Sequence, residues 1–217
     1  MPSVHRPCAE LAIDHLVVAA RSLAEGTAWL RERIGADAQA GGAHVAMGTH
    51  NAIVGLGPRR YIEVIAIDPA AVAPARPRWF ALDDPGMRAR LADGPALVHW
   101  VVRTRDIDTD ATRTDLGPIM TMTRGDFTWR ITVPGDGHLP QRGLVPTLIQ
   151  WADARHPADR LADPGLSLMA LAGEHPEPAP VRSAVAALGL SDILKVSYGR
   201  SPRLAAMLRT PRGVATL

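Results

Sequence analysis

Four polar side chains that could do chemistry lie inside short apolar stretches of this 217-residue sequence. They are His15, Glu63, His99 and Gln150. The separation along the chain is nearly the same for His15 and Glu63 as for His99 and Gln150, and the stretches around the two histidines are alike. Because a histidine or a carboxylate is costly to bury without a partner, two matching pairs predict one site built between two copies of a unit.

The residue types in this set are those that bind divalent metal ions. Two imidazoles and a carboxylate suit Zn²⁺, Fe²⁺, Ni²⁺ or Mn²⁺, with water or substrate in the open positions. A substrate with oxygens on adjacent carbons could chelate such an ion, which would stabilise an enolate-like oxyanion while a carboxylate moves a proton. Glu63 is the only carboxylate of the set and would be either ligand or base. The alternative is that the four groups hydrogen-bond one another and line a metal-free pocket.

The elements that would position these side chains follow the order strand, helix and three strands. In the first unit, Ser22 and Glu25 form a capping box that predicts a helix ending near Gly35. Apolar and β-branched runs predict strands at 11–20, 44–49, 52–56 and 60–67. Strand alternation then separates His15 and Glu63 from the apolar neighbours that pack beneath the helix.

The second unit repeats this order. Its strands are expected at 97–104, 119–123, 127–133 and 144–151, and a helix capped by Asp106 or Asp108 is expected to end near Gly117. The same alternation places His99 and Gln150 on a concave face. Two units that face each other would therefore bring all four polar groups together.

A third, weaker copy follows, with strands expected at 166–172, 193–198, 203–209 and 214–217 and a helix at 179–188. It carries the apolar Met169 and the small Ala215 and Thr216 where the other units carry polar groups. We therefore expect a structural module whose edge pairs within the chain or across a homodimer.

The predicted division is a first module at 1–68, a connector at 69–95, a second module at 96–163 and a third module at 164–217. The connector is rich in proline and alanine, with a short helix expected near 87–92. A connection of this length usually crosses between units or lines a cleft. Trp79 and Phe80 within it are expected to pack against the core or to cover that cleft.

These patterns resemble the glyoxalase-like domain proteins of the vicinal oxygen chelate superfamily, which also contains bleomycin-resistance proteins and dioxygenases. The matching stretches are residues 14–18, 48–52, 60–65 and 148–151. The resemblance implies an α+β fold of repeated βαβββ modules, two of which form a curved mixed-sheet cleft, with a third βαβββ-like module at the C-terminal end.

The resemblance also implies a ligand set. Metal-binding members use the four strand positions occupied here by His15, Glu63, His99 and Gln150. Gln150 departs from the usual glutamate, and an amide is neutral and cannot act as a base, which weakens the case for an isomerisation of the glyoxalase I type.

The implied function is the binding of a small oxygenated molecule in the inter-module cleft by a metal-dependent lyase, isomerase or dioxygenase. One alternative is a metal-free protein that binds or sequesters a small molecule, as bleomycin-resistance proteins do. Another is an interaction role in which the third module builds a dimer and the cleft is vestigial.

Three further residues are candidates for substrate contacts: His50, Asn51 and Arg130. His50 and Asn51 lie at a strand end, where Asn51 also favours a turn and His50 would also be explained by exposure. Arg130 could bind a substrate carboxylate through two hydrogen bonds or lie on a solvated strand face. His156 is expected to be a loop residue without a functional role.

Composition excludes several other classes. The formal charge is +2, and acidic and basic residues alternate without the basic stripe that phosphate binding needs, so no nucleic-acid partner is expected. A single cysteine, Cys8, excludes an intrachain disulfide and fits a reducing compartment. The first seven residues lack the apolar core of a secretory signal, and no apolar run is long enough to span a bilayer. We therefore expect a cytoplasmic protein with no membrane partner.

Overall fold

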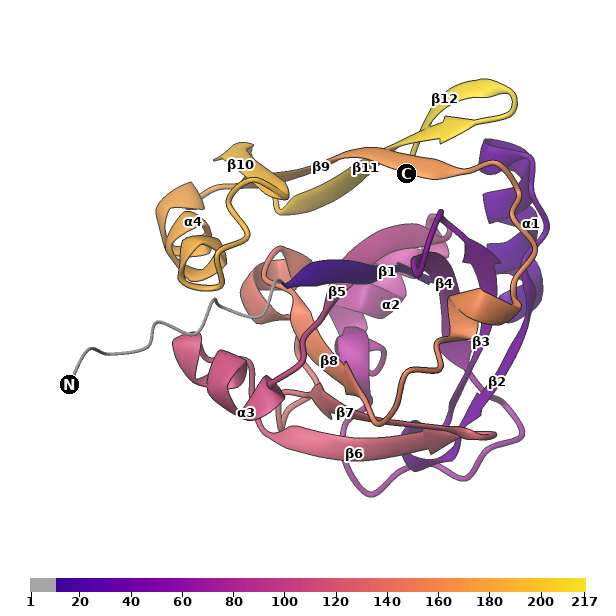
Figure 1. The fold of residues 1–217 in the computed structure, drawn as a ribbon, viewed down its shortest axis with the longest axis horizontal. Helices are drawn as coiled ribbons and strands as arrows, with labels where there is room; N and C mark the ends of the chain where they lie inside the picture. The colour runs from indigo at the N-terminus through magenta and orange to yellow at the C-terminus, as the bar shows by residue number, and fades with distance from the viewer. Residues whose placement is uncertain (1–10) are drawn as a thin grey trace.

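Eight strands form one continuous curved sheet in the computed structural model, which describes residues 11–217 (Figure 1). The strands are β1 (Ala12–Ala19), β2 (Gln39–His44), β3 (Thr49–Gly55), β4 (Tyr61–Ile67), β5 (Ala96–Arg103), β6 (Ile119–Arg124), β7 (Phe127–Thr132) and β8 (Thr147–Trp151). Their order across the sheet is β2-β3-β4-β1-β5-β8-β7-β6. Cys8 lies outside the described residues.

The two halves of this sheet have the same pairing. β1 pairs with β4 in parallel, β5 pairs with β8 in parallel, and β1 and β5 join the halves as an antiparallel pair at the centre. The repeated βαβββ order and the α+β fold class are therefore confirmed. Because the sheet curves, its outermost strands β2 and β6 approach each other, and side chains from both line one pocket.

The helices follow the local signals in part. α1 (Leu23–Ile34) begins after Ser22, whose hydroxyl accepts from the Glu25 N–H at 3.2 Å, and ends at Gly35 with φ 71°. α3 (Ile107–Asp110) is capped by Asp106 as expected, but it is one turn long and passes into a 3₁₀ turn, Ala111–Arg113. The expectation of a helix reaching Gly117 was wrong: Thr112 donates its hydroxyl to the Thr109 carbonyl, a bond that competes with helical pairing.

The connector crosses the concave face of the curved sheet. It contains a 3₁₀ turn, η2 (Trp79–Ala81), and a short helix, α2 (Pro85–Ala92). Trp79, Phe80, Met87 and Leu91 are buried there against concave-face residues of the sheet. Phe80 and Ala81 have φ values of 56° and 57°, which cost non-glycine residues about 1–3 kcal/mol each. This segment is thus held over the cleft by packing that outweighs backbone strain.

A second sheet covers the convex face (Figure 1). It consists of β9 (Ser167–His175), β10 (Leu194–Tyr198), β11 (Arg203–Thr210) and β12 (Gly213–Thr216), in the order β10-β9-β11-β12, with α4 (Pro178–Ala187) between β9 and β10. The element order repeats that of the first two modules. The strand order differs, because β10 pairs in parallel with β9 and β11 pairs antiparallel on the other side of β9.

One hydrophobic core joins the two sheets. Leu204, Ala206 and Leu208 of β11 are buried together with Trp100 and Leu148 of the curved sheet. The third module therefore stabilises the curved sheet by packing against its convex face. No helix within residues 11–217 is long and apolar enough to cross a bilayer.

We expect Leu208→Ala to lower the free energy of unfolding by about 2–5 kcal/mol, because Leu208 is fully buried in the shared core. All five tryptophans lie between residues 29 and 151, so tryptophan fluorescence during urea unfolding reports on the curved sheet and its connector. The fluorescence transition should move to lower urea in Leu208→Ala and should not move in the neighbouring exposed variant Met207→Ala. If the fluorescence transition of Leu208→Ala matched that of the wild type, the two sheets would not form one cooperative unit.

Candidate functional site

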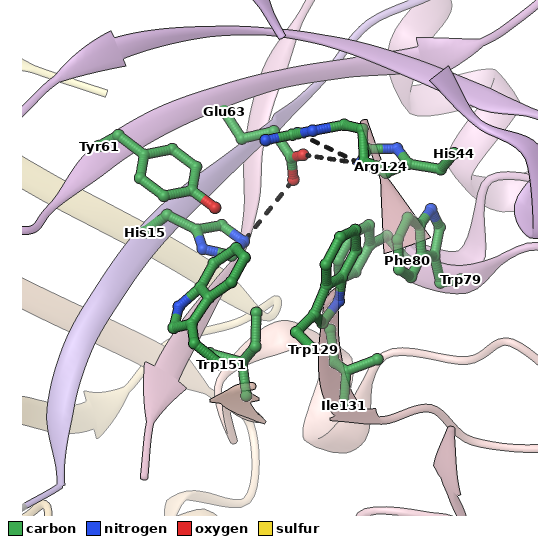
Figure 2. Close-up of a pocket in the computed structure, with 11 residues that line it drawn as sticks. His15, His44, Tyr61, Glu63, Trp79, Phe80, Arg124, Trp129, Ile131 and Trp151 are labelled. Carbon is green, nitrogen blue, oxygen red and sulfur yellow. Dashed lines mark hydrogen bonds and ion pairs between the residues drawn. The ribbon is translucent and has the colours of Figure 1, made fainter. Parts of the chain in front are cut away.

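A narrow pocket lies on the concave face of the curved sheet, between the first two modules (Figure 2). Its walls come from β1, β2, β4, η2, β6, β7 and β8, and they consist of His15, His44, Tyr61, Glu63, Trp79, Phe80, Arg124, Trp129, Ile131, Ile149 and Trp151. The cavity volume is about 20 Å³, which is room for roughly one water molecule. The pocket thus combines a small polar centre with a largely aromatic wall.

Asp14 holds His15 in place. Its Oδ1 lies 2.8 Å from His15 Nδ1, while its Oδ2 accepts from Trp151 Nε1 at 2.9 Å and lies 3.0 Å from His156 Nε2. Burial alone would raise the pKa of the Asp14 carboxyl, but the hydrogen bonds from His15 and His156 outweigh burial and hold that pKa well below its usual range. Asp14 is therefore a buried carboxylate that fixes the orientation of the His15 ring.

Neighbouring residues of a regular strand point to opposite faces, yet Asp14 and His15 touch. The pairing of β1 with β5 shifts register between Ile13 and His15. An irregularity of this kind redirects a side chain and is common next to active sites. It explains how two consecutive polar residues serve the same site.

His15 faces Glu63 across a short gap. With Nδ1 turned to Asp14, the Nε2 atom of His15 lies 3.7 Å from Glu63 Oε2. That distance is too long for a hydrogen bond. Tyr61 stacks on the His15 ring with a centroid separation of 4.6 Å. Asn51 donates to Glu63 Oε1 at 2.5 Å. His15 is therefore held by Asp14 and Tyr61, and Glu63 is held by Asn51.

A second histidine approaches Glu63 from the other side (Figure 2). His44 Nε2 lies 3.9 Å from Glu63 Oε1 and accepts from Arg124 Nη1 at 3.4 Å. Its Nδ1 lies 3.2 Å from the hydroxyl of Thr49, which also accepts from Trp79 Nε1. Burial, and then the charge of Arg124, lower the pKa of His44 well below its usual value. His44 is therefore neutral.

Burial also keeps Tyr61 protonated. Its side chain is enclosed beside Asp14 and Glu63, and burial together with these two negative charges raises the pKa of the phenol well above its usual value. Tyr61 thus supplies a neutral ring surface beside His15.

His99 is placed differently from the expectation. Its Nδ1 donates to the Gly143 carbonyl at 3.2 Å, and its Nε2 accepts from the Thr147 N–H at 3.1 Å and lies 2.9 Å from the Thr147 hydroxyl. Burial lowers the pKa of His99 to about 3. Both ring nitrogens are therefore engaged in holding the start of β8, although the ring contacts the pocket residue Phe80 with centroids 5.5 Å apart.

Gln150 lies on the opposite face of the sheet from the pocket. Its Oε1 accepts from the Ile107 N–H at 3.1 Å, and its Nε2 donates to the Arg105 carbonyl at 3.0 Å, so the amide anchors the start of α3. The neighbours Ile149 and Trp151 line the pocket instead. The alternation in β8 therefore has the opposite phase to the one expected.

Of the three expected substrate-binding residues, one lies at the site and two lie outside it. Asn51 belongs to the site through its bond to Glu63. Arg130 pairs with Asp108 of α3 at 2.6 Å, beside Gln150 and away from the pocket. His50 is absent from the pocket walls, and within residues 11–217 its buried Nε2 has no hydrogen-bond partner.

The structure thus brings His15 and Glu63 together and leaves His99 and Gln150 outside. Ligation of one metal ion by all four would require His99 and Gln150 to give up their hydrogen bonds. Across the described part of the chain, no group of three or more histidine, cysteine, aspartate and glutamate side chains is arranged to hold a metal ion. The donor set does not fit the metal that the resemblance implies.

Several residues of the site were not expected from the sequence. They are Asp14, His44, Tyr61, Arg124 and His156. His156 lies in the loop after β8 as expected, but it is buried and its Nε2 lies 3.0 Å from Asp14 Oδ2. A local signal existed only for Asp14 and Tyr61, which stand beside His15 and near Glu63 in the same apolar runs.

Comparison with known proteins identifies the family. A family model described as a glyoxalase-like domain matches residues 13–189. The chain belongs to the glyoxalase-like domain family. No curated protein matches the sequence.

The chain is also similar to solved structures, and the first of the two described below shares its fold. A hypothetical protein from Staphylococcus aureus matches with a TM-score of 0.63 and 14% identity over 89% of this chain and 88% of that chain. A methylmalonyl-CoA epimerase from Streptomyces coelicolor, in complex with 2-nitronate-propionyl-CoA, has 21% identity and a TM-score of 0.41, covering 65% of this chain and 97% of that chain.

The neutral state of His99 predicts a specific loss of stability in acid. Unfolded His99 takes up a proton near pH 6.5, whereas in the folded protein its pKa is about 3. Its contribution to stability is therefore complete above pH 6.5 and is lost as the pH falls toward 3, by about 1.4 kcal/mol per pH unit.

His99→Gln should reduce the steepness of this loss, measured as the free energy of urea unfolding between pH 7 and pH 4. The matched variant of an exposed histidine, His138→Gln, should keep the wild-type steepness. An unchanged slope in His99→Gln would contradict the assignment of His99 as a buried neutral imidazole.

Proposed function

We propose that this glyoxalase-like protein is an enzyme that binds a small oxygenated molecule in the pocket and moves a proton on it, with His15 and Glu63 as the acid–base pair. The observation that carries the proposal is the line formed by Asp14, His15 and Glu63, a buried carboxylate behind an imidazole that faces a second carboxylate. A titratable pair in a buried pocket is typical of proton-transfer sites.

The gap between the pair supports this role. His15 Nε2, an acceptor when Nδ1 carries the proton that faces Asp14, lies 3.7 Å from Glu63 Oε2. Two such acceptors repel each other unless a proton or a donor group lies between them. A C–H or O–H group of a bound molecule placed in this gap could transfer its proton to His15 Nε2, and Asp14 would stabilise the imidazolium that forms.

Glu63 would then act on the second position of the same molecule. Its carboxyl group is oriented by Asn51 and lies next to the neutral His44. Proton removal by one group and proton return by the other would produce an isomerisation, whereas proton removal followed by loss of a leaving group would produce a lyase reaction. The donors do not fit a metal ion, and the protein side chains alone would carry out these proton transfers.

A ligand larger than water needs more room than the pocket has in this conformation. Trp79 and Phe80 form the wall contributed by the connector, and Phe80 has a strained backbone. Movement of this segment would open the pocket, and its return would exclude water from the reacting groups.

A second candidate is a binding protein without chemistry. Three tryptophans and Phe80 line the pocket, and such an aromatic wall suits a planar ligand. A cytoplasmic location and a homodimer are further proposals that come from the sequence.

Hydrogen–deuterium exchange tests the proton transfer without a known substrate. Small 2-oxo acids and hydroxyketones, such as pyruvate and dihydroxyacetone, would be incubated with the protein in D₂O and followed by proton NMR. The wild-type protein should accelerate exchange at the carbon next to the carbonyl. His15→Gln and Glu63→Gln should each lower the rate by about 100-fold or more, because each removes one member of the pair.

Matched variants of exposed residues, His138→Gln and Glu174→Gln, should retain the wild-type rate. Binding of these molecules without exchange would favour the second candidate. If the His15→Gln and Glu63→Gln variants both kept the wild-type exchange rate, the proposed acid–base pair would be refuted. Elemental analysis of protein purified without chelator would show independently whether a metal accompanies the activity.

A further inference from the structure

Arg124 places a buried guanidinium in the pocket without a carboxylate beside it. The residue is 7% exposed and lies at the end of β6, among the residues that line the pocket. Within the described residues, its guanidinium makes one hydrogen bond, the 3.4 Å contact with His44 Nε2. Among residues 11–217, no aspartate or glutamate oxygen lies within 4.0 Å of its nitrogens.

The partner that Arg124 does have offers no charge. His44 is neutral because burial and the nearby Arg124 lower its pKa. A buried cation without a counter-ion is costly, and a guanidinium carries five N–H donors. The structure therefore places a largely buried cation at the pocket, with guanidinium donors that no carboxylate of residues 11–217 accepts.

Two other arginines of the described residues show the pairing with a carboxylate that Arg124 lacks. Arg130 binds Asp108 at 2.6 Å and Arg78 binds Asp83 at 2.7 Å. Glu63 lines the same pocket as Arg124 but lies beyond ion-pair distance and is held by Asn51. Among residues 11–217, Arg124 is the one arginine that is buried, and it faces the proposed reacting groups without a bonded carboxylate.

We propose that Arg124 binds a carboxylate of the ligand, so that the substrates are small carboxylic acids with a carbonyl or hydroxyl group next to the acid. This inference rests on the proposed function for the position of the chemistry. The planar guanidinium fork matches a carboxylate through two parallel hydrogen bonds. Bound there, the carboxylate supplies the missing counter-ion.

The arrangement of the pocket orients such a ligand. Figure 2 shows His15 on one side of Glu63 and His44 on the other, with the Arg124 side chain extending from the His44 side toward Glu63. A molecule held by its carboxylate at Arg124 would extend past Glu63 toward His15. The part of the ligand beyond its carboxylate, which carries the exchangeable C–H group, then lies near the acid–base pair.

Pairs of charged and neutral molecules of equal shape test this directly. Formate and acetate should raise the melting temperature of the wild-type protein by about 2–4 °C near saturation, and formamide and acetamide should not. The response to acetate should disappear in Arg124→Gln and persist in Arg209→Gln, a matched change at an exposed arginine of β11. Arg124→Lys, which keeps the charge but loses the fork, should respond more weakly than the wild type.

A second measurement tests the proposal even if Arg124→Gln folds poorly. Trp79, Trp129 and Trp151 line the pocket, so titration of the wild-type protein with acetate should change tryptophan fluorescence and titration with acetamide should not. Without any anion, Arg124→Met should melt at the same temperature as the wild type or higher, because it removes an unpaired buried charge. A clear fall in melting temperature would show that Arg124 is paired within the protein and would overturn the proposal.

The outcomes separate this inference from the proposed function. Equal responses to acetate and acetamide, no response to either carboxylate, or an equal response to inorganic phosphate would overturn carboxylate recognition. Deuterium exchange on dihydroxyacetone, which has no carboxylate, should still occur in each of these cases. Conversely, His15→Gln should keep the acetate response, so a protein that binds acetate but catalyses no exchange would refute the acid–base pair alone.

Discussion

The buried carboxylate of Asp14 is the interaction on which the site depends. It receives hydrogen bonds from His15 on its own strand, from Trp151 at the end of β8 and from His156 in the following loop. A buried carboxylate is stable only when such donors replace the water that it has lost. One charge thus ties the first module to the second and also fixes which nitrogen of His15 faces the pocket.

Burial divides the remaining polar groups of the concave face into two kinds. His44 and His99 are neutral because desolvation lowers their pKa values. Glu63 and Arg124 are the acidic and basic side chains that line the cavity. The neutral histidines hold neighbouring strands and loops in position, so the groups left for the proposed chemistry are His15, Glu63 and Arg124.

The third module supports this arrangement from the other side of the sheet. Its β11 shares a core with Trp100 and Leu148, so the curvature of the first sheet is backed by a second one. The similarity to the Staphylococcus aureus structure covers 89% of this chain, which is more than the first two modules contain. The arrangement of three modules therefore extends beyond this protein.

The sequence by itself determined the order of the elements, the duplication and the limits of α1, because capping residues, turn residues and alternating apolar positions are local signals. It also identified His15 and Glu63, since polar residues stand out in apolar strands. Tertiary structure decided the rest of the site. Alternation separates the two faces of a strand but does not say which face becomes concave, so the phase of β8 and the position of Gln150 could not be predicted.

Long-range hydrogen bonds decided the other residues. His99 bonds to Gly143 and Thr147, and His156 reaches Asp14 across most of the chain. Arg124 meets His44 because the two ends of the curved sheet approach each other. These contacts depend on sheet curvature and loop paths, which come from the packing of the whole molecule and leave no local pattern in the sequence.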